Sequence, residues 1–341
     1  MLSIEKKRIA RSTRWLRGQV QVFLSGTVLL ALLLVLWNEF QTKENLEQIW
    51  YSFGQQLEGA NVLWLAFALL LMPLNWLAET LKWRAFVGQY QPLPLGRALL
   101  AVWVGVSFSL FTPYRIGEYG GRIVLIKPEH RWKAAIANVI GNISQYLVLL
   151  FTGIAGAYLL FRQLGWFAPF WLNAAAGIAL AGILLLLVGY LNLKRLASLI
   201  KRLPLPARWQ FLKKELEILR QFNPSELSAI LAWSATRYFI YASQYFLLLQ
   251  FFGISPGIIT GYAGIAAIFL VQTSLPLPPL TALLARGHLA LQVWPLLGGN
   301  EVSSLAATFV LWIINLILPA LIGTFSLFYV SIANATGYED D

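Results

Sequence analysis

Three ionisable residues follow a Thr-Pro pair in an otherwise apolar part of the chain. Thr112 and Pro113 come first, and Arg115, Glu118 and Arg122 come directly after them. Spacings of three and four residues place these side chains on one face of a helix. Guanidinium groups bind phosphate through paired hydrogen bonds, and a carboxylate beside them limits the cost of their desolvation. The pattern predicts a gate or headgroup site in which the arginines bind phosphate and Glu118 pairs with them; the alternative is a cytoplasmic-side ion cluster that only anchors the segment.

Two further arginines lie within apolar segments. Arg237 is near the middle of the segment 226–252, and Arg286 follows a proline-rich stretch in another. An arginine at membrane depth costs roughly 3 kcal/mol on insertion scales, so each must face the protein interior. No carboxylate is near them in the sequence, and Glu118 or a lipid phosphate is the expected counter-ion. For Arg286 the alternative is a cap on carbonyl groups at a helix break, or snorkelling to the interface.

His288 completes the set as a titratable candidate, although a lone histidine in an apolar helix is typical of a packing residue. The predicted substrate-binding residues are therefore Thr112, Pro113, Arg115, Glu118, Arg122, Arg237, Arg286 and His288.

The composition is that of a membrane protein. Of 341 residues, 58% are hydrophobic and 12% are charged. Several apolar runs reach the roughly 20 residues that a spanning helix needs. We therefore expect an all-α polytopic membrane protein with about six spanning helices and two shorter, re-entrant helical hairpins.

The sequence offers little for catalysis. The only aspartates are Asp340 and Asp341, there are two histidines and no cysteine, and neither a His-Glu-x-x-His nor a Gly-x-Ser-x-Gly motif occurs. A phosphate-cradling Gly-x-x-x-x-Gly-Lys loop is also missing from the sequence. These motifs carry metal, nucleophile and nucleotide chemistry. We expect no enzymatic activity, no cofactor and no catalytic residue.

Basic residues set the expected orientation, because cytoplasmic loops carry an excess of Lys and Arg. Six precede the first expected span, 20–37, and eight lie in the loop 192–223, so both segments are predicted to be cytoplasmic. Within this loop, the amphipathic segment 209–222 is expected to lie on anionic headgroups. A second span, about 61–78, leads to a cytoplasmic segment that contains Lys82, Arg84 and Arg97.

A complete crossing by the next apolar segment would contradict this charge rule. It would place all the basic residues from Arg115 to Lys133 outside. The contradiction disappears if the segment 98–126 enters from the cytoplasm, breaks near Pro113 and returns. Pro113 lacks an N–H and disfavours helix at Thr112, and irregular backbone at membrane depth is tolerated only beside protein or a water-filled cavity. The break is therefore expected to line a cavity.

The second half of the chain repeats this plan in the opposite orientation. The segment 258–297 is broken by Leu275-Pro-Leu-Pro-Pro279 and is predicted to be a hairpin that enters from outside. The expected organisation is 1–60, a basic amino terminus, first span and external segment; 61–191, the first repeat and a connecting span; 192–223, the basic loop; and 224–341, the second repeat and tail. Inverted repeats with interrupted helices point to a transporter site where the breaks meet.

The segment 111–122, which reads Phe-Thr-Pro-Tyr-Arg-Ile-Gly-Glu-Tyr-Gly-Gly-Arg, resembles the flippase-like membrane family typified by the transmembrane region of lysylphosphatidylglycerol synthase. The segment 75–83 is similar to the family's basic-Trp motif, and 276–286 lies where its second proline-rich motif falls. There the sequence has Leu-Pro-Pro-Leu-Thr and Arg286 in place of the family's Pro-Gly-Gly and following Glu. The resemblance covers about 61–330 and implies a lipid-translocating or lipid-binding unit, without the soluble domain that makes the lipid in synthase relatives.

The predicted function is flippase-like translocation or binding of an anionic lipid or lipid-linked cell-envelope intermediate in the bacterial inner membrane, with both termini cytoplasmic. The expected partners are membrane lipids, and nucleic acid is not among them. One alternative is a non-enzymatic partner that recruits a cytosolic lipid synthase or glycosyltransferase through the loop 192–223. A further alternative is an ion-coupled transporter of a small solute, which the scarcity of membrane-embedded carboxylates disfavours.

Overall fold

The computed structural model describes residues 46–57, 59, 61–110, 112, 115–202, 219–275 and 282–326. This part of the chain is helical and contains no strand, which confirms the predicted all-α fold. The first expected span, Pro113, most of the segment 209–222 and the second proline-rich break at 276–281 lie outside the described residues.

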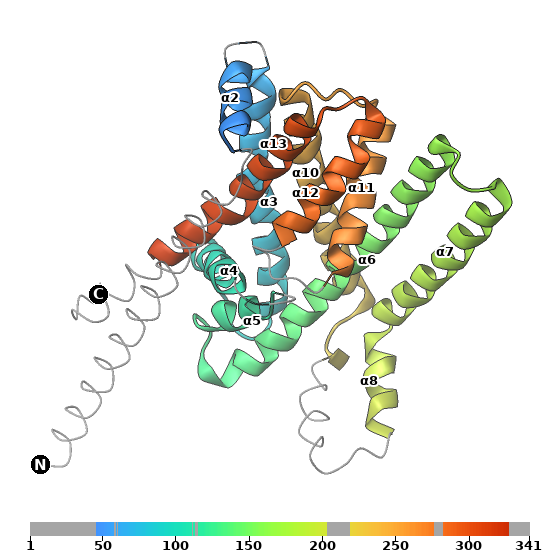
Figure 1. Cartoon of the computed structure of the whole chain (residues 1–341). Helices are drawn as coiled ribbons and strands as arrows, with labels where there is room; N and C mark the ends of the chain where they lie inside the picture. Colours follow the sequence, from blue (N-terminus) through green and yellow to red (C-terminus); the bar gives the residue numbers. More distant parts are fainter. Residues whose placement is uncertain are drawn as a thin grey trace, which may run out of the picture.

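By chain order, eight of the labelled helices fall into two sets of four (Figure 1). The first set comprises α3 (Val62–Val87), α4 (Leu95–Ser109), α5 (Ile116–Ile123) and α6 (Arg131–Leu164). The second comprises α10 (Pro224–Phe251), α11 (Ile258–Ser274), α12 (Ala282–Val293) and α13 (Glu301–Trp312), which continues through a π-helix, Ile313–Ile317, as a helix to residue 326. Helices α2 (Leu46–Leu57), α7 (Pro169–Leu191) and α8 (Leu193–Arg202) lie outside these sets.

Four of the described helical segments are long and apolar enough to cross a membrane: Val62–Val87, Pro128–Leu164, Pro169–Leu191 and Glu301–Ser326. Helix α10 has 28 residues and includes Arg237. By contrast, α4 and α11 have 15 and 17 residues. At 1.5 Å per residue they are about 22 Å and 26 Å long, short of the roughly 30 Å hydrocarbon core. These are the first arms of the two predicted hairpins.

The first hairpin is tightly closed. Helices α4 and α5 pack antiparallel, and a Cβ added to Gly121 would lie 2.7 Å from the Cα of Gly105. The two backbones therefore approach as closely as only glycine allows. The second hairpin pairs α11 with α12 in the same antiparallel sense, since Gln272 contacts Arg286 and a Cβ added to Gly264 would lie 3.1 Å from the Val293 side chain.

Each set, a predicted repeat, consists of a long helix, two short helices and a long helix. Helices α3 and α10 pack antiparallel: Gln244 donates to the carbonyl oxygen of Ala68, and Arg237 pairs with Glu79 further along α3. The hairpin of each set also packs against the last helix of the other set. Helix α11 packs on α6, and Ser107 of α4 donates to the carbonyl oxygen of residue 320 in the last helix. The halves therefore interlock around one core.

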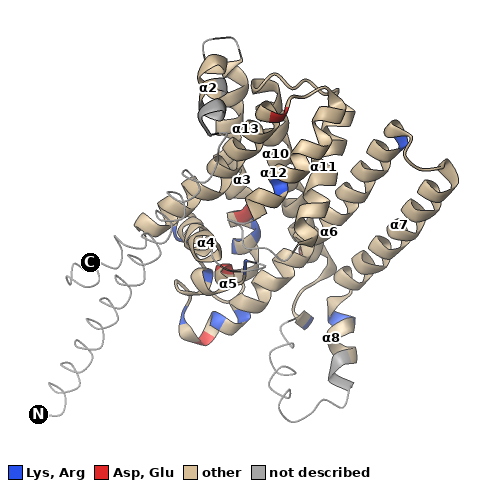
Figure 2. Cartoon of the chain, in the orientation of Figure 1, with Lys and Arg blue, Asp and Glu red and all other residues tan. Residues whose placement is uncertain are grey.

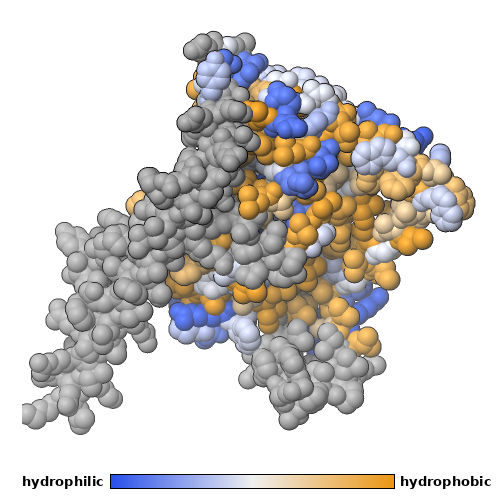
Figure 3. All heavy atoms as spheres, viewed as in Figure 1, coloured by the Kyte–Doolittle hydropathy of each residue, from blue (hydrophilic) through white to orange (hydrophobic). Residues whose placement is uncertain are grey.

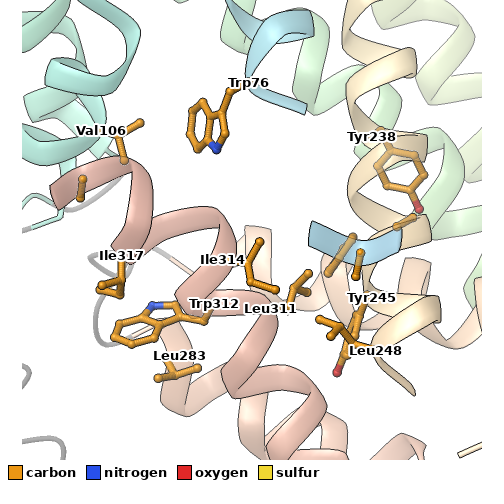
Figure 4. Close-up of a cluster of buried hydrophobic side chains, with 14 of the residues drawn as sticks. Trp76, Val106, Tyr238, Tyr245, Leu248, Leu283, Leu311, Trp312, Ile314 and Ile317 are labelled. Carbon is orange, nitrogen blue, oxygen red and sulfur yellow. The ribbon is translucent and has the colours of Figure 1, made fainter. Parts of the chain in front are cut away.

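Large apolar side chains from both repeats fill that core. Trp76 of α3, Tyr245 of α10 and Trp312 of α13 are all buried in it (Figure 4). Outside the core, hydrophobic residues cover much of the visible surface (Figure 3). On α7, for example, Ile178 and Leu185 are largely exposed. Such a surface suits contact with lipid tails.

One predicted boundary was wrong. The second span was expected to end near residue 78, followed by a cytoplasmic segment that contained Lys82, but α3 continues to Val87 and Lys82 is buried. The reason is that its ammonium group pairs with Glu79, one turn earlier on the same helix. Because these charges are paired, this part of α3 can stay buried in the bundle. Unpaired charges would be expected to lie outside it.

Candidate functional site

A buried ion cluster joins three helices in the middle of the bundle. Glu79 of α3 lies 2.7 Å from Lys82 Nζ, 2.7 Å from Arg122 Nη2 of α5 and 3.1 Å from Arg237 Nη1 of α10. Both acidic and basic residues occur near α5, whereas most of the ribbon of the surrounding helices is tan, the colour of other residue types (Figure 2). One carboxylate thus holds three cations and ties the two repeats together.

Glu118 extends the cluster towards the turn of the first hairpin. Its carboxylate lies 3.0 Å from Arg115 Nε and also accepts a hydrogen bond from Arg122. Glu118 and Arg122 share a face of α5 as predicted, whereas Arg115 precedes this helix and pairs with Glu118 from the hairpin turn. Glu118 is 4% exposed as a side chain and Arg115 is 35% exposed, so the pair runs from the interior to an open surface.

The hairpin turn is shaped by backbone geometry and by Thr112. Helix α4 ends at Ser109 and α5 begins at Ile116, and Arg115 between them has a left-handed φ of 58°. The hydroxyl of Thr112 accepts a hydrogen bond from the N–H of Gly117 at 2.8 Å, which satisfies one free donor of the short helix. Thr112, predicted as a substrate-binding residue, is thus engaged in the turn itself. Pro113 lies outside the described residues.

A cavity of about 250 Å³ lies next to the ion cluster. Its lining comes from both repeats and includes Arg115 and Glu118 of the first hairpin, Arg237 of α10 and Arg286 of α12. The lining does not include Glu79, Lys82 or Arg122. The side chain of Arg237 is 17% exposed against 2% for Arg122, so Arg237 can meet a ligand and Arg122 cannot.

Arg286 reaches the cavity from the second hairpin. Its Nε donates to Gln272 Oε1 at 2.6 Å and its Nη1 to the hydroxyl of Tyr241 at 2.6 Å. Tyr241 is one turn beyond Arg237 on α10, about 6 Å along the axis. Residues of both hairpins therefore border one cavity together with Arg237 and Tyr241 of α10. His288 is exposed and is not part of the cavity lining, so the structure does not bring it to the site.

Neutral polar side chains also border the cavity, among a larger number of aromatic and aliphatic ones. Asn142 donates to the hydroxyl of Tyr119, Gln145 to the carbonyl oxygen of Ser234, and Asn75 to Asn315 Oδ1 within the π-helix. These bonds join different helices. The same residues also border the cavity, together with Gln272 and Thr273.

Glu79 was missed by the sequence reasoning, which named Glu118 or a lipid phosphate as the counter-ion of Arg237. The structure corrects this assignment, because Glu79 is the carboxylate nearest to Arg237 among the ion pairs of the described residues. A signal was present: Glu79 and Lys82 are three residues apart, within the segment that carries the basic-Trp motif. That spacing indicates an ion pair on one helix face.

The fold and the site together define a polytopic helical membrane protein with a charged cavity between its two interlocked helix sets. A model of the lysylphosphatidylglycerol synthase transmembrane region matches residues 20–323. The chain therefore belongs to that family. A search of curated proteins found no match to the chain.

Proposed function

We propose that this protein binds the headgroup of an anionic lipid, or of a lipid-linked cell-envelope intermediate, and moves it between the two leaflets. The observation that carries the proposal is the charge of the cavity lining. Arg115, Arg237 and Arg286 border the cavity, and Glu118 is the one carboxylate among its lining residues within the described chain. Guanidinium groups in a partly buried site favour phosphate.

The size and the mouth of the cavity support a headgroup site. A volume of about 250 Å³ is below the roughly 300–1,000 Å³ of pockets that enclose a drug-sized ligand. It suits a headgroup without its acyl chains. Tyr146 and Leu275 line the cavity and are 41% and 42% exposed, so the mouth reaches an apolar surface. The tails can remain in the bilayer while the headgroup enters.

The proposal includes an orientation of the chain in the membrane. Both hairpins are re-entrant, the first entering from the cytoplasm and the second from outside, in a bacterial inner membrane with both termini cytoplasmic. The short α4 and α11 and the antiparallel packing of α3 on α10 support this arrangement. The protein acts by binding and movement, without covalent chemistry or a cofactor.

Reconstitution tests the proposal. Proteoliposomes are prepared with a headgroup-accessible fluorescent phosphatidylglycerol, and membrane-impermeant dithionite reports the fraction exposed outside over time. The protein should accelerate exchange over protein-free vesicles, and Arg237→Gln should slow it. The matched control is Arg162→Gln, an arginine near the end of α6 that does not border the cavity. No acceleration for any acidic lipid, with none co-purifying, would contradict the proposal.

A second candidate function, recruitment of a cytosolic lipid synthase or glycosyltransferase, is supported by the surface of α8. This helix exposes Lys194 and Arg195 and buries Leu193 and Ala197. Under recruitment, Lys194→Glu with Arg195→Glu should abolish binding of the soluble enzyme. Under the translocation proposal, the same double variant should exchange lipid at the wild-type rate in vesicles.

A further inference from the structure

Two long helices that border the cavity, α3 and the last helix, each contain a proline. Pro73 lies inside α3, and Pro319 lies in the last helix shortly after the π-helix Ile313–Ile317. Proline has no N–H for the carbonyl group four residues earlier, and its ring clashes with that group. In the last helix the backbone is widened just before Pro319, where the N–H of Leu318 donates to a carbonyl oxygen five residues earlier. Prolines and π turns are the usual places where helices bend.

A buried hydrogen bond joins the two breaks. Asn75, two residues after Pro73, donates to Asn315 Oδ1 at 2.8 Å, and Asn315 lies four residues before Pro319. The two asparagines are 1% and 6% exposed. Asn315 also donates to the carbonyl oxygen of Leu311 in its own helix, at 3.4 Å. Polar side chains that bond across an apolar bundle fix how two helices align. The two breaks are therefore held next to each other.

After the breaks, both helices hold the first hairpin. Glu79 of α3 pairs with Arg122 of α5 at 2.7 Å. In the last helix, the carbonyl oxygen of Ala320 accepts a hydrogen bond from Ser107 of α4 at 2.7 Å. A Cβ added to Gly323 would lie 2.8 Å from Ser107 Oγ, so the last helix and α4 are in close contact. The hairpin α4–α5 and the segments 74–87 and 318–326 thus form one packed unit, the hairpin group.

Before the breaks, both helices hold α10 instead. The carbonyl oxygen of Ala68 in α3 accepts from Gln244 of α10 at 2.9 Å. The hydroxyl of Thr308 in α13 bonds to the hydroxyl of Tyr245 in α10 at 2.6 Å. These buried bonds place the earlier parts of α3 and of the last helix in a second group with α10. Each of the two helices therefore passes from one group to the other at its proline.

We propose that Pro73 and the π-helix before Pro319 form one paired hinge, about which the hairpin group moves as a unit. The hydrogen bond between Asn75 and Asn315 is the latch of this hinge. Residues next to the breaks line the cavity, so movement there changes the cavity wall; they are Asn75, Trp76, Trp312 and Asn315. The hinge goes beyond lipid movement, because it is built from contacts within the chain and needs no ligand.

The ion cluster indicates which contact changes when the hinge moves. Glu79 lies 2.7 Å from both Lys82 and Arg122, which belong to the hairpin group, and 3.1 Å from Arg237 of α10. Glu79 should therefore move with the hairpin group, and its distance to Arg237 should lengthen. Arg237 is 17% exposed, so water in the cavity can solvate it when they separate.

Distances between spin labels test the hinge in the full-length protein. The sequence contains no cysteine, so labels attach only at introduced cysteines. Val124→Cys with Glu301→Cys spans the two groups, and Val124→Cys with Ile322→Cys lies within the hairpin group; all three positions are exposed. Pulsed electron spin resonance in phosphatidylcholine nanodiscs should give two distances for the first pair and a single distance for the second.

Two substitutions should shift the hinge in opposite directions. Asn315→Leu removes the latch and should raise the population of the minor distance by about two- to tenfold, the factor that one hydrogen bond contributes. Pro319→Leu restores a backbone N–H and should leave a single distance. Ser144→Ala is the matched control, because it removes a buried bond of 2.6 Å to Ser234 between α6 and α10, and should leave the wild-type distribution.

The control pair keeps the test independent of a folding defect. An unchanged Val124–Ile322 distance in each variant shows that the hairpin group is intact and supports its movement as a unit. A second distance for this pair, a single distance for the Val124–Glu301 pair in the wild type, or a wild-type distribution in Asn315→Leu would each overturn the hinge. Two distances without any lipid exchange in vesicles would overturn translocation and leave the hinge supported.

Discussion

Replacement of Glu79 by Gln tests the buried ion cluster directly. The carboxylate is 2% exposed and contacts Lys82, Arg122 and Arg237 at 2.7, 2.7 and 3.1 Å. The amide has nearly the same shape but leaves these three cations with Glu118 as the remaining carboxylate of the cluster. Removal of one partner from a buried ion pair typically costs about 3–5 kcal/mol. We expect Glu79→Gln to lower the free energy of unfolding by that amount.

The assay is equilibrium unfolding in mixed micelles, followed by tryptophan fluorescence. Glu301→Gln is the control, because this exposed glutamate in the first turn of α13 is expected to contribute less than about 1 kcal/mol. Adding Lys82→Met to Glu79→Gln removes one uncompensated cation, so the double variant should be more stable than the sum of the two single effects predicts, by about 1–3 kcal/mol. A Glu79→Gln variant as stable as the Glu301→Gln control, or strictly additive effects, would refute the reasoning.

Two further predictions concern the first hairpin. Glu118→Gln removes the one carboxylate that borders the cavity in the described chain. An anionic lipid should therefore bind more tightly, by about tenfold for each 1.4 kcal/mol of repulsion relieved. Unchanged or weaker binding in native mass spectrometry would count against the assigned role. Thr112→Val removes the acceptor for the N–H of Gly117 and should lower the local free energy of opening by about 1 kcal/mol. Hydrogen exchange at the start of α5 should then be roughly fivefold faster. Thr112→Ser keeps the hydroxyl and should exchange as the wild type does.

The architecture was accessible from sequence because it depends on a few strong constraints. The basic residues from Arg115 to Lys133 argue against a complete crossing before them, and the Thr112-Pro113 break predicted the turn between α4 and α5. The spacing of Glu118 and Arg122 predicts their shared face of one helix. These are local features, so one helix or one loop suffices to predict them.

The ion pairs between different helices could not be predicted from the sequence in this way. Glu79 meets Arg122 across 43 residues, and hydropathy does not say which face of α3 turns towards α5 and α10. Lys82 was predicted to lie in a cytoplasmic segment because charges interrupt the apolar run, although Lys82 pairs with Glu79 within α3. His288 was also predicted to lie at the site but does not line the cavity. It follows Arg286 by two residues and therefore lies about 200° further around the helix, away from the cavity.

The absence of cysteine from the sequence allows a direct test of the central claim, that an acidic headgroup occupies the cavity between the repeats. Thr273→Cys places a thiol on the cavity lining, and Ser274→Cys places one next to it, exposed and outside the lining. The measurement is labelling by a charged thiol reagent in phosphatidylcholine vesicles with and without phosphatidylglycerol. Our account predicts that phosphatidylglycerol slows labelling at position 273 and leaves position 274 unchanged. Equal labelling of position 273 with and without the acidic lipid would contradict it.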